Sequence, residues 1–105
     1  MSVYVDDARI PYGRMKMCHM VADTTDELLA MADAIGVRRK WIQKPGTYRE
    51  HFDVCTAKRD AALKHGALLL SAHALAEFLW QRRPTQAQAP EGAHPSSRQE
   101  RPADG

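Results

Sequence analysis

The spacing of apolar residues predicts a helix over about residues 25–35. Apolar positions recur there at intervals of three and four, so one helical face is apolar. Thr24 precedes the segment and Glu27 follows three residues later, which is the pattern of a capping box. Gly36 follows the last apolar position and is expected to end the helix in a left-handed conformation.

Two further helices are predicted in the second half of the chain. One covers about residues 56–65 and stops at Gly66. The other begins after Ser71, a good N-cap residue, and is closed by Pro84. Each follows a segment that reads as a loop or a strand.

Short runs rich in β-branched, aromatic and apolar residues predict four strands, at about residues 2–6, 15–22, 37–43 and 67–70. Loops are expected at residues 9–14 and from residue 44 to about residue 55. Strands that alternate with helices favour right-handed crossovers. We therefore expect a small α/β domain of two or three layers, with a mostly parallel four-stranded sheet in the order β-β-α-β-α-β-α.

The chain divides into two parts of different composition. Residues 84–105 hold four of the six prolines and no Leu, Ile, Val, Phe, Tyr or Trp, so burial cannot offset the entropy of ordering them. We predict a disordered Pro-rich tail there and a single domain over residues 1–83. A domain this small has modest stability, so a homodimer is one possible assembly.

Charge and cysteine content narrow the class of protein. The formal net charge is +2, which is small for a general nucleic-acid binder. Cys18 and Cys55 lie far apart without a CxxC pair, which suits a reducing compartment rather than a disulfide framework or a zinc site. No signal peptide and no apolar run of membrane-spanning length is recognised, so we expect a cytoplasmic protein with no membrane partner.

The segment from His51 to Arg59 concentrates chemically useful side chains around an expected helix start. His51 and Asp53 are two residues apart, so in an extended segment both face the same way and could form a catalytic imidazole–carboxylate pair. Lys58 and Arg59 follow in the first helical turn, where a bound anion would relieve their conflict with the helix dipole. The alternatives are a capping aspartate, an exposed loop histidine and a solvated helical face.

Other polar residues follow the predicted strands. If the strands are parallel, their carboxyl ends meet at one edge, where ligands of open α/β sheets bind. Asp6 and Asp7 are candidate metal ligands there, with Mg²⁺ as the candidate ion. We also assign ligand binding to residues near the second strand, although each has a structural alternative as a cap or a core histidine. These are His19, Asp23 and Thr24.

Three further features have mainly structural interpretations. The run Arg38-Arg39-Lys40 is read as solvated surface, with an acidic or nucleic-acid partner as the alternative. Trp41 and Trp80 are interpreted as packing residues rather than as platforms for base stacking.

These residues resemble a known family of short bacterial and phage proteins, domain of unknown function family 4031. The resemblance covers about residues 2–80, and its motifs are specific in combination. They are Val3-Tyr4-Val5-Asp6-Asp7, His19-Met20-Val21-Ala22-Asp23-Thr24 with Glu27-Leu28, Trp41, His51-Phe52-Asp53-Val54, Lys58-Arg59 and Gly66-Ala67.

The resemblance implies a grouping of site residues but no reaction. The family usually has tyrosine where this chain has Phe52, which leaves a role for that hydroxyl unsupported here. A weaker, fold-level resemblance to PIN-type nucleases rests on the strand ending Val5-Asp6 and on residues 60–70.

Together these features predict a protein that binds a phosphate-bearing ligand, either a nucleotide or a nucleic-acid end. Metal-dependent phosphoester hydrolysis is the first enzymatic hypothesis. One alternative is a non-catalytic module of phage type that sequesters a nucleotide or binds a protein. Another is an accessory protein that binds nucleic acid.

Overall fold

The computed structural model describes residues 2–84, so the predicted tail lies, apart from Pro84, outside the described residues. The strands are β1 (Val3–Asp6), β2 (Ile10–Tyr12), β3 (Met15–Ala22), β4 (Phe52–Cys55) and β5 (Leu68–Leu70). The helices are α1 (Thr25–Ile35), α2 (Thr56–Lys64) and α3 (Ala72–Gln81), with a short 3₁₀ helix η1 (Arg39–Trp41). None of the helices in residues 2–84 has the length and apolarity needed to cross a membrane.

The strands form one mixed sheet with the long strand β3 at its centre. β1 and β2 pair with the two ends of β3 along one side, and β4 pairs with its middle along the other side. All three pairings are antiparallel, and only β5 runs parallel to its neighbour, β1. The predicted mostly parallel sheet is therefore wrong. The tight turn at Gly13 (φ 62°) returns the chain directly, which joins antiparallel strands.

Three local expectations also differ from the structure. The segment 37–43 contains η1 (Arg39–Trp41) rather than a strand, and within this segment only Gln43 pairs, through an isolated bridge to His51. The fourth strand is instead supplied by residues 52–55, in the segment expected to be a loop. Residues 10–12, also expected to be a loop, form β2.

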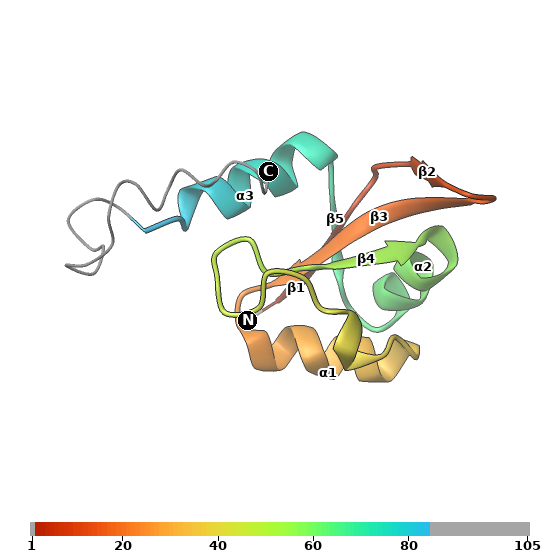
Figure 1. Ribbon diagram of the computed structural model, residues 1–105, viewed down its shortest axis with the longest axis horizontal. Helices are drawn as coiled ribbons and strands as arrows, with labels where there is room; N and C mark the ends of the chain where they lie inside the picture. The colour runs from red at the N-terminus through yellow and green to blue at the C-terminus, as the bar shows by residue number, and fades with distance from the viewer. Residues whose placement is uncertain (1, 85–105) are drawn as a thin grey trace.

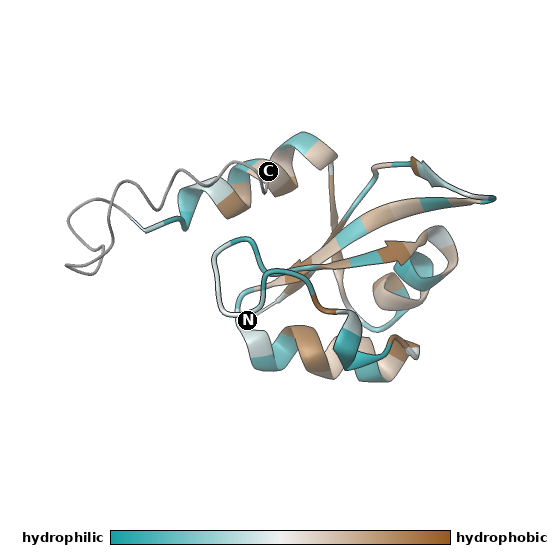
Figure 2. Ribbon diagram, viewed as in Figure 1, coloured by the Kyte–Doolittle hydropathy of each residue, from teal (hydrophilic) through white to brown (hydrophobic). Residues whose placement is uncertain are grey.

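Helices cover both faces of the sheet, which gives three layers (Figure 1). α1 and α2 pack on one face, and α3 lies across the other. The main core lies between the sheet and the α1–α2 pair, where Val5, Met20, Leu28 and Phe52 are fully buried. Figure 2 shows single hydrophilic residues among hydrophobic ones along β3 and β4.

The predicted helix ends are confirmed. Thr24 Oγ1 accepts a hydrogen bond from the backbone N–H of Glu27 at 3.2 Å. Gly36 ends α1 in the left-handed conformation with φ 81°. Ser71 caps α3 by accepting from the N–H of Ala74 at 3.0 Å.

Two contacts hold α3 at its opposite ends. Asp7 Oδ1 accepts from the N–H of Ala72 at 2.9 Å at the start of the helix. Beyond its last turn, Arg82 donates from Nη1 to the carbonyl oxygen of Ala22 at 2.7 Å. Between them the rings of Tyr4 and Phe78 pack with centroids 4.7 Å apart. These contacts set the position of the helix over the sheet.

Candidate functional site

The pleat of the sheet places polar side chains on the face that α3 covers. Along β3, Cys18 and Met20 point into the core and are fully buried, so His19 between them points to the opposite face. Asp53 of β4 is the register partner of His19, and both therefore lie on the same face. Asp6 contacts His19 from the other side of β3.

Asp6 is a buried carboxylate that binds His19 twice. Its Oδ2 lies 2.8 Å from His19 Nδ1, and its Oδ1 accepts from the backbone N–H of His19 at 2.9 Å and of Ala8 at 3.2 Å. The Asp6 residue is 1% exposed. Burial alone raises its pKa, but the hydrogen bonds from His19 and Ala8 outweigh burial, so the pKa of Asp6 is lowered. The carboxylate is therefore ionised and accepts the Nδ1–H of His19.

The contact with Asp6 shifts the pKa of the His19 imidazole upward. The hydrogen bond that His19 donates to Asp6 is the main influence on the pKa of His19, and the charges of Asp6 and Asp53 add to it. These outweigh partial burial, so the pKa of His19 lies above its ordinary value of 6.5. Its Nδ1 is engaged by Asp6, which leaves Nε2 as the atom presented to the site.

Asp53 lies between two imidazoles. Its Oδ1 is 3.9 Å from His19 Nε2 and 3.4 Å from His51 Nε2, and the two rings meet edge to face with centroids 5.7 Å apart. Gln43 Nε2 donates to Asp53 Oδ2 at 2.8 Å and orients the carboxylate. His51 Nδ1 lies 2.7 Å from the carbonyl oxygen of Arg49, which can only accept, so Nδ1 carries a proton. In neutral His51 the free lone pair is then on Nε2.

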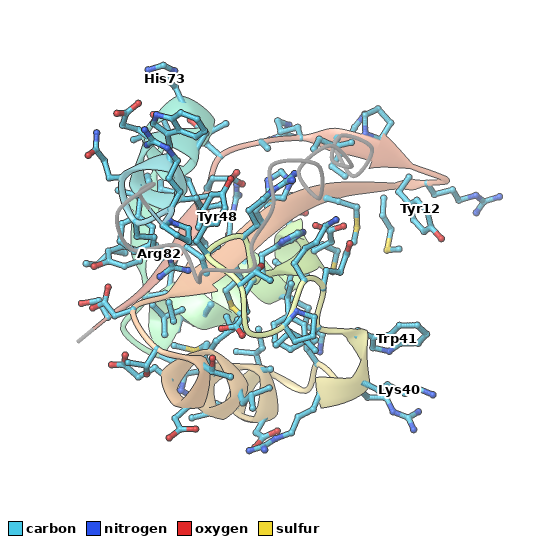
Figure 3. The ribbon with its side chains drawn as sticks, turned by 60° about the vertical axis from the view of Figure 1, so that its left-hand side comes forward. Tyr12, Lys40, Trp41, Tyr48, His73 and Arg82 are labelled. Atoms are coloured by element: carbon cyan, nitrogen blue, oxygen red, sulfur yellow. The ribbon has the colours of Figure 1, made fainter. Side chains whose placement is uncertain are left out.

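These side chains line a cavity of about 400 Å³ between the sheet and α3. One wall is polar and comes from the strands and from the loop between η1 and β4. The other wall is mainly apolar and comes from α3. The polar wall is formed by Asp6, His19, Gln43, Lys44, Arg49, His51 and Asp53, and the α3 wall by Ala72, Leu75, Ala76 and Leu79. Figure 3 shows Tyr48 and Arg82 close together, on the loop that bounds the cavity and at the end of α3.

The structure separates Asp23 and Thr24 from this cavity. β3 runs antiparallel to β1, so its carboxyl end lies at the opposite edge of the sheet from Asp6. Asp23 accepts hydrogen bonds from the N–H of Ser2 at 2.8 Å and from the hydroxyl of Tyr4 at 3.1 Å. Thr24 is the cap of α1. Both make local structural contacts, and the expected single cleft is wrong for these two residues.

Lys58 and Arg59 also lie away from the imidazoles, on α2 at the core face of the sheet. Lys58 Nζ donates to the carbonyl oxygen of Ile35 at 2.8 Å and so caps the C-terminus of α1. Arg59 Nε lies 3.4 Å from Asp60 Oδ1. The two cations expected to hold a phosphate at the start of α2 therefore have partners within the protein and do not line the cavity.

Asp6 and Asp7 do not form the expected pair of metal ligands. Both oxygens of Asp6 accept hydrogen bonds, and Asp7 turns away to the start of α3. Within residues 2–84, no group of three or more His, Cys, Asp or Glu side chains is placed to hold a metal ion.

Sequence reasoning missed the part of the site contributed by the loop before β4. Gln43 orients Asp53, and Lys44 and Arg49 line the cavity. The sequence does contain a signal for this part of the site. Pro45-Gly46 predicts a turn, and a turn there brings Lys44 and Arg49 near each other. The wall from α3 was also missed, since it depends on which sheet face that helix covers.

Phe52 lies between two cavity residues in sequence but on the other face of the sheet. It is fully buried in the core beneath α1 and α2. The aromatic ring at this position therefore belongs to the core and does not line the cavity.

Comparison with known proteins supports the resemblance noted from the motifs. A family model described as Protein of unknown function (DUF4031) matches residues 3–82. No curated protein and no solved structure matches the chain. The match spans every strand and helix described above.

Proposed function

The chain belongs to the family of proteins of unknown function DUF4031, and from its cavity we propose that it binds a phosphate-bearing ligand and cleaves a phosphoester bond by acid–base catalysis. The proposal rests chiefly on one observation. The Nε2 atoms of His19 and His51 face the same oxygen of Asp53 inside the cavity.

The two imidazoles differ in a way that suits a division of roles. His19 has a raised pKa, so near neutral pH it carries the proton that a general acid donates more often than an ordinary imidazole does. Neutral His51 keeps its Nε2 lone pair, because Nδ1 donates to the carbonyl of Arg49. In the proposed reaction His51 Nε2 takes a proton from an attacking water or hydroxyl, whose oxygen bonds to phosphorus. His19 Nε2–H gives its proton to the leaving oxygen as the old P–O bond breaks.

Asp53 provides a way to restore the starting state. After one turnover His51 is protonated and His19 is neutral. The Asp53 carboxylate faces both Nε2 atoms, so it can accept the proton from one ring and return it to the other. Asp6 holds the His19 ring in position and stabilises its protonated form, so it acts as a positioning residue.

Recognition of phosphate is supported by the cations of the polar wall. Protonated His19 stands in the cavity with Lys44 and Arg49. Phosphate oxygens accept charge-assisted hydrogen bonds from all three types of side chain. The α3 wall supplies the apolar surface that covers the rest of a nucleotide-sized ligand.

Turnover of simple phosphoesters tests the proposal. Bis(p-nitrophenyl) phosphate and dinucleotides are supplied to the full chain, with EDTA and with added Mg²⁺. His19→Ala and His51→Ala should each lower kcat/KM by about 100-fold or more, as expected for loss of an acid or a base. His73→Ala is the matched control, because His73 lies exposed on α3 and points away from the sheet in Figure 3. A different result would identify a binder rather than an enzyme. That result is tight binding of nucleotides with no ester cleavage, and a His51→Ala change that lowers affinity alone.

A further inference from the structure

The cations of the chain are unevenly distributed. Residues 8–22 and 34–49 contain no Asp or Glu but hold eight of the thirteen Lys and Arg residues in residues 2–84. The rest of this range holds all ten acids. Among these cations, Arg39 pairs with an acid outside the two segments, and its Nη2 lies 2.7 Å from Asp33 Oδ2. A nearly neutral protein thus has two segments of strongly positive charge.

The same two segments expose aromatic side chains. Tyr12 is 68% exposed at the end of β2, and Trp41 is 60% exposed at the end of η1. Lys40 Nζ lies 5.1 Å from the centroid of the Trp41 ring. In Figure 3, Tyr12, Lys40 and Trp41 project outward along the same side of the molecule. The interpretation of Trp41 as a packing residue is therefore wrong, because the chain forms a 3₁₀ turn there rather than a strand.

The positive segments continue into the cavity. Two of their eight cations, Lys44 and Arg49, line the polar wall. Trp41 precedes Gln43 by two residues, and Gln43 holds the Asp53 carboxylate. Positive charge and an exposed aromatic ring thus extend from the candidate acid–base site to the outer surface along one segment of chain.

We propose that the ligand is a single-stranded nucleic acid longer than one nucleotide. One phosphate lies in the cavity, and the adjoining nucleotides lie on the outer surface, where Trp41 and Tyr12 stack on bases and the neighbouring cations contact the backbone. Unpaired bases offer flat faces to exposed aromatic rings, whereas a duplex buries those faces. An acidic peptide would satisfy the cations but would leave the aromatic rings without planar partners. The cavity part of this model rests on the proposed function.

Fluorescence anisotropy of labelled 12-nucleotide oligo(dT) and oligo(U) with the full chain tests the proposal. Trp41→Ala should weaken binding by about tenfold, since stacking on one aromatic side chain contributes on that scale. Trp80→Ala is the matched control, because Trp80 is also half exposed and also has a cation over its ring, Arg83 at 3.6 Å, but lies on α3. Lys40→Gln should reduce the slope of log K against log salt by about 0.7, the loss of one single-strand phosphate contact.

The outcomes separate this proposal from the proposed function. Binding of mononucleotides without binding of the 12-nucleotide strands overturns the strand proposal and leaves the phosphate site intact. The strand proposal is also overturned if duplexes bind as strongly as single strands. It is overturned as well if Trp41→Ala and Trp80→Ala weaken strand binding equally. Trp41-dependent strand binding without any ester cleavage supports the strand surface and overturns the catalytic function instead.

Discussion

Oδ2 of Asp6 lies 2.8 Å from Nδ1 of His19, and the Asp6 residue is only 1% exposed while the His19 side chain is one-third exposed. A buried carboxylate thus faces inward and holds a ring whose other nitrogen faces a cavity. The arrangement links protonation of the site to stability of the fold, because the same contact shifts the pKa of both groups.

The first prediction concerns the pKa of His19. Its folded pKa is raised above 6.5, so its stabilising contribution is complete below pH 6.5 and is lost as pH rises through the folded pKa. NMR titration of the imidazole should give a pKa above 6.5 in the wild type and a lower one in Asp6→Asn. A wild-type pKa at or below 6.5 contradicts the described contact.

The Asp6 carboxyl makes the complementary contribution. Its folded pKa is lowered, so its contribution is present above the ordinary value of 3.8 and is lost as pH falls through the folded pKa. Denaturation at several pH values should therefore show the largest gap between wild type and Asp6→Asn between pH 3.8 and 6.5.

Removal of the Asp6 side chain should destabilise the fold strongly. Asp6→Ala leaves the partly buried N–H donors of His19 and Ala8 without their acceptor, at a cost of about 3 kcal/mol in the free energy of unfolding. Chemical denaturation measures the change. Asp53→Ala is the control, because Asp53 is 40% exposed and its loss should cost under about 1 kcal/mol.

Lys58 should contribute to stability and not to the site. Lys58→Met removes the donor to the carbonyl of Ile35 and a cation at the C-terminus of α1, with an expected loss of about 1 kcal/mol. Lys64→Met, an exposed change in the same helix, should have little effect. Phosphoester turnover and nucleotide affinity should be unchanged in both variants, and a selective loss of affinity in Lys58→Met would restore the phosphate role assigned from sequence.

Arg82 should hold the end of α3 against the sheet. Arg82→Met removes the bond to the carbonyl of Ala22 and the contact of the guanidinium with the Phe78 ring, 4.8 Å from its centroid. We expect a loss of about 2 kcal/mol and faster amide exchange in α3. Arg83→Met is the control, because Arg83 donates to the carbonyl of Trp80 in the last turn of α3 rather than to the sheet. Equal exchange in the two variants contradicts the proposed anchoring.

Much of the fold could be read from local patterns. Thr24 and Gly36 marked the ends of α1, and Ser71 marked the start of α3, because caps are set by residues next to them in sequence. Strand direction is not local. The sheet was expected to be parallel from the alternation of elements, but the hairpin at Gly13 made β3 antiparallel and moved Asp23 to the other edge.

Part of the site can be predicted from antiparallel strand pairing rather than from the carboxyl ends of parallel strands. Asp6, His19, His51 and Asp53 share one cavity because antiparallel pairing puts alternate residues of neighbouring strands side by side. Lys58 was grouped with His51 because it is near in sequence. The strand-to-helix junction at Cys55 separates them, since α2 packs on the opposite face of the sheet.

The alternation along β3 has a consequence for how this protein can change. Within β3, an insertion of one residue just before Cys18 would turn the imidazole of His19 into the core and send Cys18 to the cavity, whereas an insertion of two would keep both orientations. Length changes in the hairpin at Gly13 leave that alternation untouched. The hairpin can therefore vary in length, whereas any insertion within β3 must contain an even number of residues to keep each side chain on its face of the sheet.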